Sequence, residues 1–197
     1  MYTLCTTEKT ALQQRQLERA FLAVSLEMPY DDITISEICR RAGLSRKIFY
    51  RLFEKKADVL YALLDHTLLD SESYQPDPSV GDGGIHRFLA FWREQKDLLD
   101  VLKRNQNSTL LTDRALRHIL SEDSEIRRCF GTDDTEHGRE ALLFYISGLF
   151  ALVLDWHNQD FAQSIDQLSQ TLMYLMMTPP VKHPLLGNPY LMEHAKV

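Results

Sequence analysis

The chain has 197 residues, with 22 basic and 28 acidic side chains, and its hydrophobic content of 44% is that of a soluble globular protein. This length allows one ordinary domain, or a small and a medium one. The three cysteines are an odd number without metal-like spacing, which argues against a disulfide framework, and residues 1–16 lack the basic and apolar segments of a signal peptide. We therefore expect a cytoplasmic protein in a reducing compartment.

The first predicted element is a helix over residues 7–28. Its apolar residues recur at spacings of three and four, which is the pattern of a helix with one buried face. Pro29 ends the helix. The apolar stripe consists of Leu17, Ala20, Phe21, Val24 and Met28. We expect this stripe to cover the core of the segment that follows.

Residues 33–60 are predicted to form two short helices joined by a tight turn, followed by the start of a third helix. Thr34 and Glu37 form a predicted capping box, in which each side chain accepts from the backbone N–H of the other residue. Gly43 stands where a helix would end in the left-handed conformation, and Ser45 can cap the second helix. This order is typical of a helix-turn-helix, whose second helix enters the major groove of DNA.

Charge is distributed unevenly along the chain. Residues 40–56 contain seven basic residues and one acid, whereas residues 61–197 contain twelve basic residues and twenty acids. A basic module on an acidic body is typical of a DNA-binding protein. A solvated helical face that is basic by chance would show the same charge, so charge alone leaves both interpretations open.

The segment 29–64 resembles the N-terminal DNA-binding domain of TetR-type bacterial transcriptional regulators. The sequence departs from the family at Pro29, where many members have Gly, and at Ala57, where an acid is common; neither position faces DNA. The shared features begin with an aromatic residue, Tyr30, before an Ile-Thr-Ile entry at 33–35. An Ala-Gly-Leu-Ser turn follows at 42–45, and a Phe-Tyr-x-x-Phe sequence at 49–53. The last feature is Lys56 before an apolar pair, Val59 and Leu60.

The resemblance implies an all-α protein with an N-terminal three-helix helix-turn-helix domain and a helical C-terminal domain for ligand binding and dimerisation. We place the first domain at residues 1–55 and the second at 56–197. The resemblance further implies a regulator, in most members a repressor, that binds an inverted repeat in double-stranded DNA as a homodimer. A small-molecule effector in the C-terminal domain would then change the affinity for DNA. We predict no cofactor.

Base contacts are expected from the start of the second helix of the helix-turn-helix, which points into the groove. Arg46 is the first candidate, because its guanidinium can bond guanine O6 and N7 together, and Lys47 is the second. By resemblance, Tyr50 bonds a backbone phosphate. An ordinary half-buried tyrosine would fit the same pattern.

Phosphate contacts are expected on either side of this helix. By resemblance and position, Thr34 at one helix start and Lys56 at another are expected to bind phosphates. Arg51 either faces DNA or pairs with an acid. The predicted DNA-binding residues are Thr34, Ser45, Arg46, Lys47, Tyr50, Arg51 and Lys56.

The body is predicted to be helical throughout. A helix over 56–71 leads to a loop at 74–84 that is rich in Pro and Gly. Residues 85–106 follow as a helix with a break near 95–97, where the apolar stripe shifts. Shorter helices are predicted at 108–120 and 124–130. No segment alternates as a strand would, so the expected fold class is all-α.

The strongest apolar run covers residues 141–154, in which twelve of fourteen residues are apolar. Crossing a bilayer needs ~20 residues, so we predict no membrane span. A helix that is apolar nearly all round needs cover on nearly all sides, which either a second subunit or the core of a monomer would supply.

A last helix begins at a predicted capping box of Ser164 and Gln167. The predicted dimer interface consists of Ser147, Gly148, Ala151, Leu168, Leu172 and Leu175; the role of residues 179–197 stays open.

A ligand pocket is expected among the aromatic residues of the body, although such residues at helical spacing are commonly core. The candidate lining is Phe88, Phe91, Trp92, Phe130, Phe144 and Tyr145, with His118. The histidines show no pair at ligand spacing, so we predict no metal site. We predict no enzyme activity, because the chain lacks a Gly-rich phosphate loop and a nucleophile elbow. The alternative function is a DNA-bound adaptor whose body binds a protein partner and no small ligand.

Overall fold

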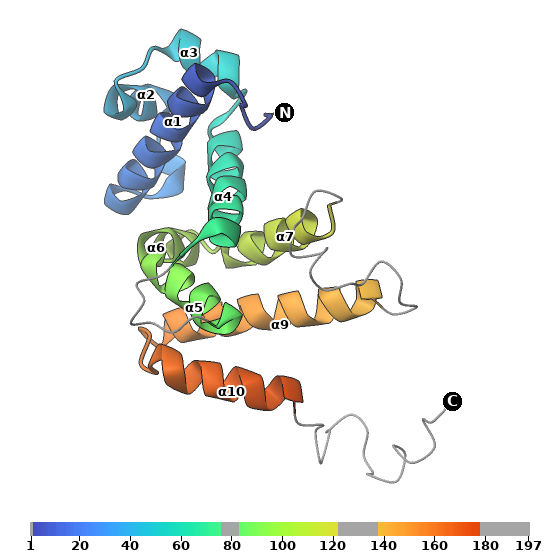
Figure 1. The fold of residues 1–197 in the computed structure, drawn as a ribbon. Helices are drawn as coiled ribbons and strands as arrows, with labels where there is room; N and C mark the ends of the chain where they lie inside the picture. Colours follow the sequence, from blue (N-terminus) through green and yellow to red (C-terminus); the bar gives the residue numbers. More distant parts are fainter. Residues whose placement is uncertain (1, 76–82, 122–137, 178–197) are drawn as a thin grey trace.

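The computed structural model describes residues 2–75, 83–121 and 138–177, and every regular element in these ranges is a helix, as predicted. A head of three helices lies at one end of the molecule, and α4 leads from it to a body that holds the remaining helices (Figure 1). The head contains α1 (Glu8–Glu27), η1 (Tyr30–Asp32), α2 (Ile35–Ala42) and α3 (Arg46–Leu52).

The head has its own apolar core, and α1 supplies one side of it. Leu17, Phe21 and Val24 of the predicted stripe are fully buried, as are Ile38 of α2 and Phe49 of α3. α1 packs against α2, α3 and α4. The predicted first helix is therefore confirmed, with boundaries one residue inside those expected at each end.

α4 (Lys56–Ser73) connects the head to the body, because it packs against both α1 and α7. Its N-terminus is capped by Asp58, whose carboxylate accepts from the backbone N–H groups of Glu54 and Lys55 at 3.1 Å each. The buried carboxylate thus satisfies two backbone donors at the point where the chain leaves the head.

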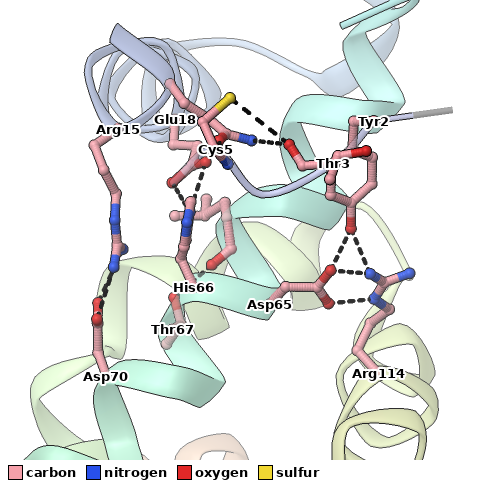
Figure 2. Close-up of polar contacts among 12 residues, drawn as sticks. Tyr2, Thr3, Cys5, Arg15, Glu18, Asp65, His66, Thr67, Asp70 and Arg114 are labelled. Carbon is pink, nitrogen blue, oxygen red and sulfur yellow. Dashed lines mark hydrogen bonds and ion pairs between the residues drawn. The ribbon is translucent and has the colours of Figure 1, made fainter. Parts of the chain in front are cut away.

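Polar contacts hold α4 at a fixed place on α1 (Figure 2). Glu18 of α1 is 1% exposed, and both of its carboxylate oxygens lie 2.8 Å from Nδ1 of His66 on α4. Burial raises the pKa of Glu18, while the bond from His66 opposes this effect. At the surface, Arg15 donates two hydrogen bonds to Asp70. An apolar contact could slide, whereas these paired groups fix one register between the two helices.

The N-terminal segment is tied to α4 and α7 through a second polar cluster (Figure 2). The Tyr2 hydroxyl donates to Asp65 of α4, and the same carboxylate accepts from Nε of Arg114 on α7 at 2.7 Å. Burial and the bond to Asp65 raise the pKa of Tyr2, so its hydroxyl stays protonated. One carboxylate therefore links three separate segments of the chain.

The body consists of α5 (Gly84–Glu94), α6 (Lys96–Arg104), α7 (Ser108–Ile119), α9 (Gly138–Asn158) and α10 (Ile165–Met177). The predicted break near 95–97 is confirmed at Gln95 between α5 and α6. The predicted capping box of α10 is also confirmed, since Ser164 and Gln167 each accept from the backbone N–H of the other. Within the core, the rings of Trp92 and Phe150 lie 5.2 Å apart.

α9 is longer than the apolar run that predicted it. Polar residues extend the helix at both ends, to 21 residues, and by length and composition alone it could cross a membrane. A core helix of a soluble protein passes the same test, and a third of the apolar window is buried inside the subunit. His157 near its end is buried and bonds Asp100 of α6 at 2.8 Å, which is an interaction of a helix packed within the fold.

Several expected features lie outside the described residues. They are Cys129, Phe130, the helix predicted at 124–130, the tail 179–197 and most of the loop predicted at 74–84.

Candidate DNA-binding interface

The turn between α2 and α3 is set by Gly43, which has φ 67° and ψ 25°, the left-handed conformation that glycine adopts without steric cost. The backbone N–H groups of Gly43 and Leu44 donate to the carbonyls of Arg40 and Cys39, at 3.3 and 3.0 Å. These bonds close the end of α2. Ser45 then caps α3, with its side-chain oxygen accepting from the N–H of Ile48 at 3.3 Å.

The two sides of α3 differ in exposure. Phe49 and Leu52 are buried in the head, whereas Arg46, Lys47 and Tyr50 are exposed. Arg46 Nη2 lies 3.5 Å from the hydroxyl of Tyr50, and the guanidinium carbon lies 5.9 Å from the centre of that ring. Arg46 and Tyr50 thus form one exposed unit, and no interaction of the Lys47 side chain is present among the described residues.

The start of α2 has only half of the predicted capping box. Thr34 accepts from the backbone N–H of Glu37 at 3.2 Å, as expected. The Glu37 carboxylate does not return a bond to Thr34; it accepts from the guanidinium of Arg40, at 2.9 and 2.5 Å. A charged partner three residues along the helix outcompetes a neutral backbone donor, since charge-assisted hydrogen bonds are about twice as strong. Thr34 stays exposed at the helix start.

Comparison with protein families identifies this module. Residues 22–63 match the family model of bacterial regulatory proteins of the tetR family. This match supports a TetR-type regulator, and it covers the helix-turn-helix region of the chain. The chain is therefore a DNA-binding transcriptional regulator, with a helix-turn-helix at the N-terminus and a helical body. No curated protein matches the chain.

Two basic side chains of this TetR head are turned toward the protein itself. Arg51 donates from Nη2 to the side-chain oxygen of Gln13 on α1 at 2.5 Å, so it pairs with an amide, which neither of the two expected alternatives included. Arg41 likewise pairs with Glu27 at the end of α1. The basic charge of the segment is thus partly used within the head.

Lys56, predicted to bind a phosphate, makes contacts within the protein that the sequence analysis did not include. Its ammonium donates to the carbonyls of Tyr30, Asp31 and Ile33, at 2.6, 3.2 and 3.0 Å, and lies 4.3 Å from the centre of the Tyr30 ring. All three N–H donors of the ammonium are therefore used. Lys56 fixes the segment that leads into Thr34. In this arrangement it supports the candidate DNA-binding interface indirectly, by holding that segment in place. No local pattern could predict these bonds, because the carbonyls are backbone groups more than twenty residues away.

Among the described residues, the aromatic side chains of the predicted pocket fall into a buried group and an exposed group. Phe91 and Trp92 are buried in the body core, where Trp92 packs against Phe88. Phe144 and Tyr145 lie on the outer side of α9, and Phe144 is 76% exposed. The core alternative fits the first group, and the common lining stays a prediction, because Phe130 lies outside the described residues. His118 of the same set bonds Glu72 of α4 at 2.8 Å.

The residues predicted for a dimer interface also fall into two groups. Leu168 and Leu172 are buried inside the chain itself, on the side where α10 packs against α5. Gly148 and Ala151 of α9 are exposed, Ser147 is half-buried, and Leu175 is 59% exposed. The helical period places two of the predicted leucines on the inner side of α10, and only the packing of α10 shows which side that is.

Contacts that the sequence did not predict join the body to the head. Arg104, at the end of α6, donates to the carbonyls of Leu26 and Met28 at the end of α1, at 3.0 and 3.4 Å. Asn105 accepts from the backbone N–H of Tyr30 at 3.1 Å. These bonds satisfy backbone groups at the end of α1, and they couple the position of α6 to the orientation of the head.

Proposed function

We propose that this TetR-family regulator is a repressor that works in the cytoplasm and binds an inverted-repeat operator as a homodimer. Its head (1–55) reads DNA sequence, and its body (56–197) forms the dimer and responds to a small molecule. The observation that carries the proposal is the outer side of α3, where Arg46, Lys47 and Tyr50 are exposed while the other side of the helix is buried.

Readout of a base pair fits Arg46 best. Its guanidinium is exposed and can donate two hydrogen bonds to one guanine. Tyr50 lies one turn further along α3, holds the Arg46 side chain from one side, and offers its hydroxyl to a phosphate. Lys47 and Thr34 add donors at the edges of the same surface, and such contacts set the register of the head on DNA.

Dimerisation is supported by the outer side of α9 and α10. Phe144, Gly148 and Ala151 follow one another at spacings of four and three, so they lie on one side of α9, and all three are exposed. On α10, Met173, Tyr174 and Leu175 are exposed. Large apolar side chains exposed on two helices favour a protein contact, and the small residues beside Phe144 allow a second helix to approach closely. Two-fold symmetry would then present two heads to half-sites about one DNA turn apart.

The experiment is selection of DNA sites from a random pool by the purified chain at a fixed salt concentration. The wild type is compared with a double variant, Arg46→Ala with Tyr50→Ala, and with Arg117→Ala as the control, because Arg117 is an exposed arginine of the body. We expect the wild type and the control to enrich an inverted repeat, and the double variant to lose the enrichment.

Each outcome decides one part of the proposal. Enrichment of a single half-site without its repeat would contradict the dimer and retain sequence readout. Equal enrichment by the double variant would contradict the role of the α3 surface. No enrichment by the wild type would contradict sequence-specific repression and favour the adaptor, whose protein partner would then be sought.

A further inference from the structure

A cavity of about 340 Å³ lies where the head, α4 and α7 meet. Tyr30 of η1 forms the head side, Tyr61 of α4 a second side, and Asn107, Thr109 and Asp113 at the start of α7 the body side. Leu60 and Leu110 provide apolar surface. This volume suits a small molecule. We call this space the junction cavity; it is separate from the aromatic core of the body.

The polar groups that face the junction cavity lack protein partners. Within the part of the chain that the structure describes, no hydrogen bond is made by the hydroxyls of Tyr30, Tyr61 and Thr109, by the Asn107 amide or by the Asp113 carboxylate. The neighbouring side chains of Arg104 and Asn105, by contrast, bond backbone groups of the head. Several unpaired groups that converge on one space are what a site for a polar ligand requires.

The charge of the site is negative. Asp113 is the only lining residue that carries a formal charge at neutral pH. Two cations lie against the tyrosine rings of the lining, and their N–H groups are bonded elsewhere: Lys56 binds three carbonyls, and Arg114 binds Asp65. A ligand that brings its own positive charge would therefore complete the pairing of Asp113.

The tyrosines add to the preference for a cation. Burial raises the pKa of Tyr30, and Tyr61, Asp31 and Asp58 raise it further, so the hydroxyl stays neutral in an acidic surrounding. Neutral phenol oxygens accept hydrogen bonds from an ammonium group. The rings themselves already face protein cations, since Lys56 lies 4.3 Å from the centre of the Tyr30 ring and Arg114 lies 5.4 Å from that of Tyr61, so the hydroxyl oxygens are the groups left for a ligand. The apolar surface of Leu60 and Leu110 would cover a hydrocarbon part of the same molecule.

We propose that the junction cavity is the effector site of this regulator and that it binds a small organic amine in its protonated form. The ammonium bonds Asp113 and the hydroxyl and amide oxygens around it, while the hydrocarbon part lies against Leu60 and Leu110. The role as an effector site rests on the proposed function; the binding of the amine does not.

The position of the cavity explains how occupancy would reach DNA. An occupant touches Tyr30 of the head and α7 of the body together, directly beside the hydrogen bond from Tyr30 N–H to Asn105. A ligand shifts an equilibrium only through its different affinity for two states. The head orientation that fits the amine best would be favoured, and the spacing of the two heads on an operator would change with it.

The test is isothermal titration calorimetry of the full chain, without DNA, with three probes of matched size. They are 2-phenylethylammonium, the neutral 2-phenylethanol and the anionic 3-phenylpropanoate. We expect the ammonium probe to bind most tightly. Equal affinity for the neutral probe, or tighter binding of the anion, would overturn the proposed ligand class, and no binding of the ammonium probe would overturn the site.

Two variants locate the binding. Asp113→Asn keeps the size of an exposed side chain and removes its charge. We expect this variant to bind the ammonium probe with a Kd about tenfold higher or more. Asp97→Asn removes an exposed carboxylate on α6 as the control and should leave the affinity unchanged. Equal affinities of both variants and the wild type would overturn the site. The far-UV circular dichroism of each variant shows that it is folded.

DNA binding is measured separately, so that the two proposals fail independently. With an operator obtained by selection, a saturating concentration of the ammonium probe should change the Kd of the wild type for DNA, and Asp113→Asn should not respond. An unchanged Kd with the probe bound would overturn the effector role.

Discussion

Gly43 determines the turn of the helix-turn-helix through its backbone alone. Its φ of 67° lies in the left-handed region, and a Cβ built there would meet no atom within 4 Å. The cost of a side chain at this position is therefore conformational and involves no clash. Because the turn sets the angle between α2 and α3, this cost bears on the exposed surface of α3 as well.

We expect Gly43→Ala to lower the free energy of unfolding by about 1–2 kcal/mol, the cost of a left-handed alanine. Urea denaturation followed by circular dichroism measures it. Gly84→Ala is the control, because Gly84 also has open space around it but no positive φ. An equal loss in both variants would show that a side chain as such, and not the backbone conformation, is the cause.

At the scale of elements, sequence patterns predicted what is local. The helices of the head follow from caps, a glycine and apolar spacings, all within a few residues of one another, and the break at Gln95 follows from a shift of the stripe. Periodicity also placed Leu168 and Leu172 on one side of α10. It could not show that this side faces α5, because that depends on how the helices assemble.

The site illustrates the same limit. Exposure of Arg46, Lys47 and Tyr50 could be predicted, since the helical period places them on the side of α3 away from the apolar Ile48 and Leu52. The partners of Lys56 could not, because three carbonyls of a distant segment converge on it only in the folded chain. The junction cavity is likewise formed by three segments that no local pattern relates.

The outer side of α9 permits a test of dimerisation. Phe144→Glu places a charge on the most exposed large apolar residue that the structure describes. Burying an unpaired charge in an interface is costly, so we expect the variant to dissociate at concentrations where the wild type is a dimer. Sedimentation velocity over a range of concentrations measures this.

The matched control for the dimer is Leu12→Glu. Leu12 is a 57% exposed leucine of the head, so the substitution makes the same change from an apolar to an acidic side chain away from α9. We expect it to sediment as the wild type does. If Phe144→Glu also sediments as the wild type at every concentration, the outer side of α9 is not the interface.

For the whole molecule, the uneven charge of the chain connects the head to its partner. The chain carries a net charge of −6, yet residues 40–56 are strongly basic. The acidic body repels DNA at a distance, so the orientation of approach is set by the head. Several of the basic side chains nevertheless bond within the protein, including Arg40, Arg41, Arg51 and Lys56. Net basic charge therefore overstates the number of phosphate contacts.

The salt dependence of DNA binding separates side chains that contact phosphate from those that support the fold. Each neutralised phosphate contributes about −0.9 to the slope of log K against log salt concentration. Lys47 has no partner among the described residues, so Lys47→Ala should reduce the slope by about 0.9 per subunit.

Lys56→Met should leave the slope unchanged and lower the free energy of unfolding by about 2 kcal/mol, because three carbonyls lose a charged donor. Fluorescence anisotropy on the selected operator at four or more salt concentrations gives the slopes. A slope reduced equally by both substitutions would show that Lys56 leaves its carbonyls and reaches phosphate in the complex.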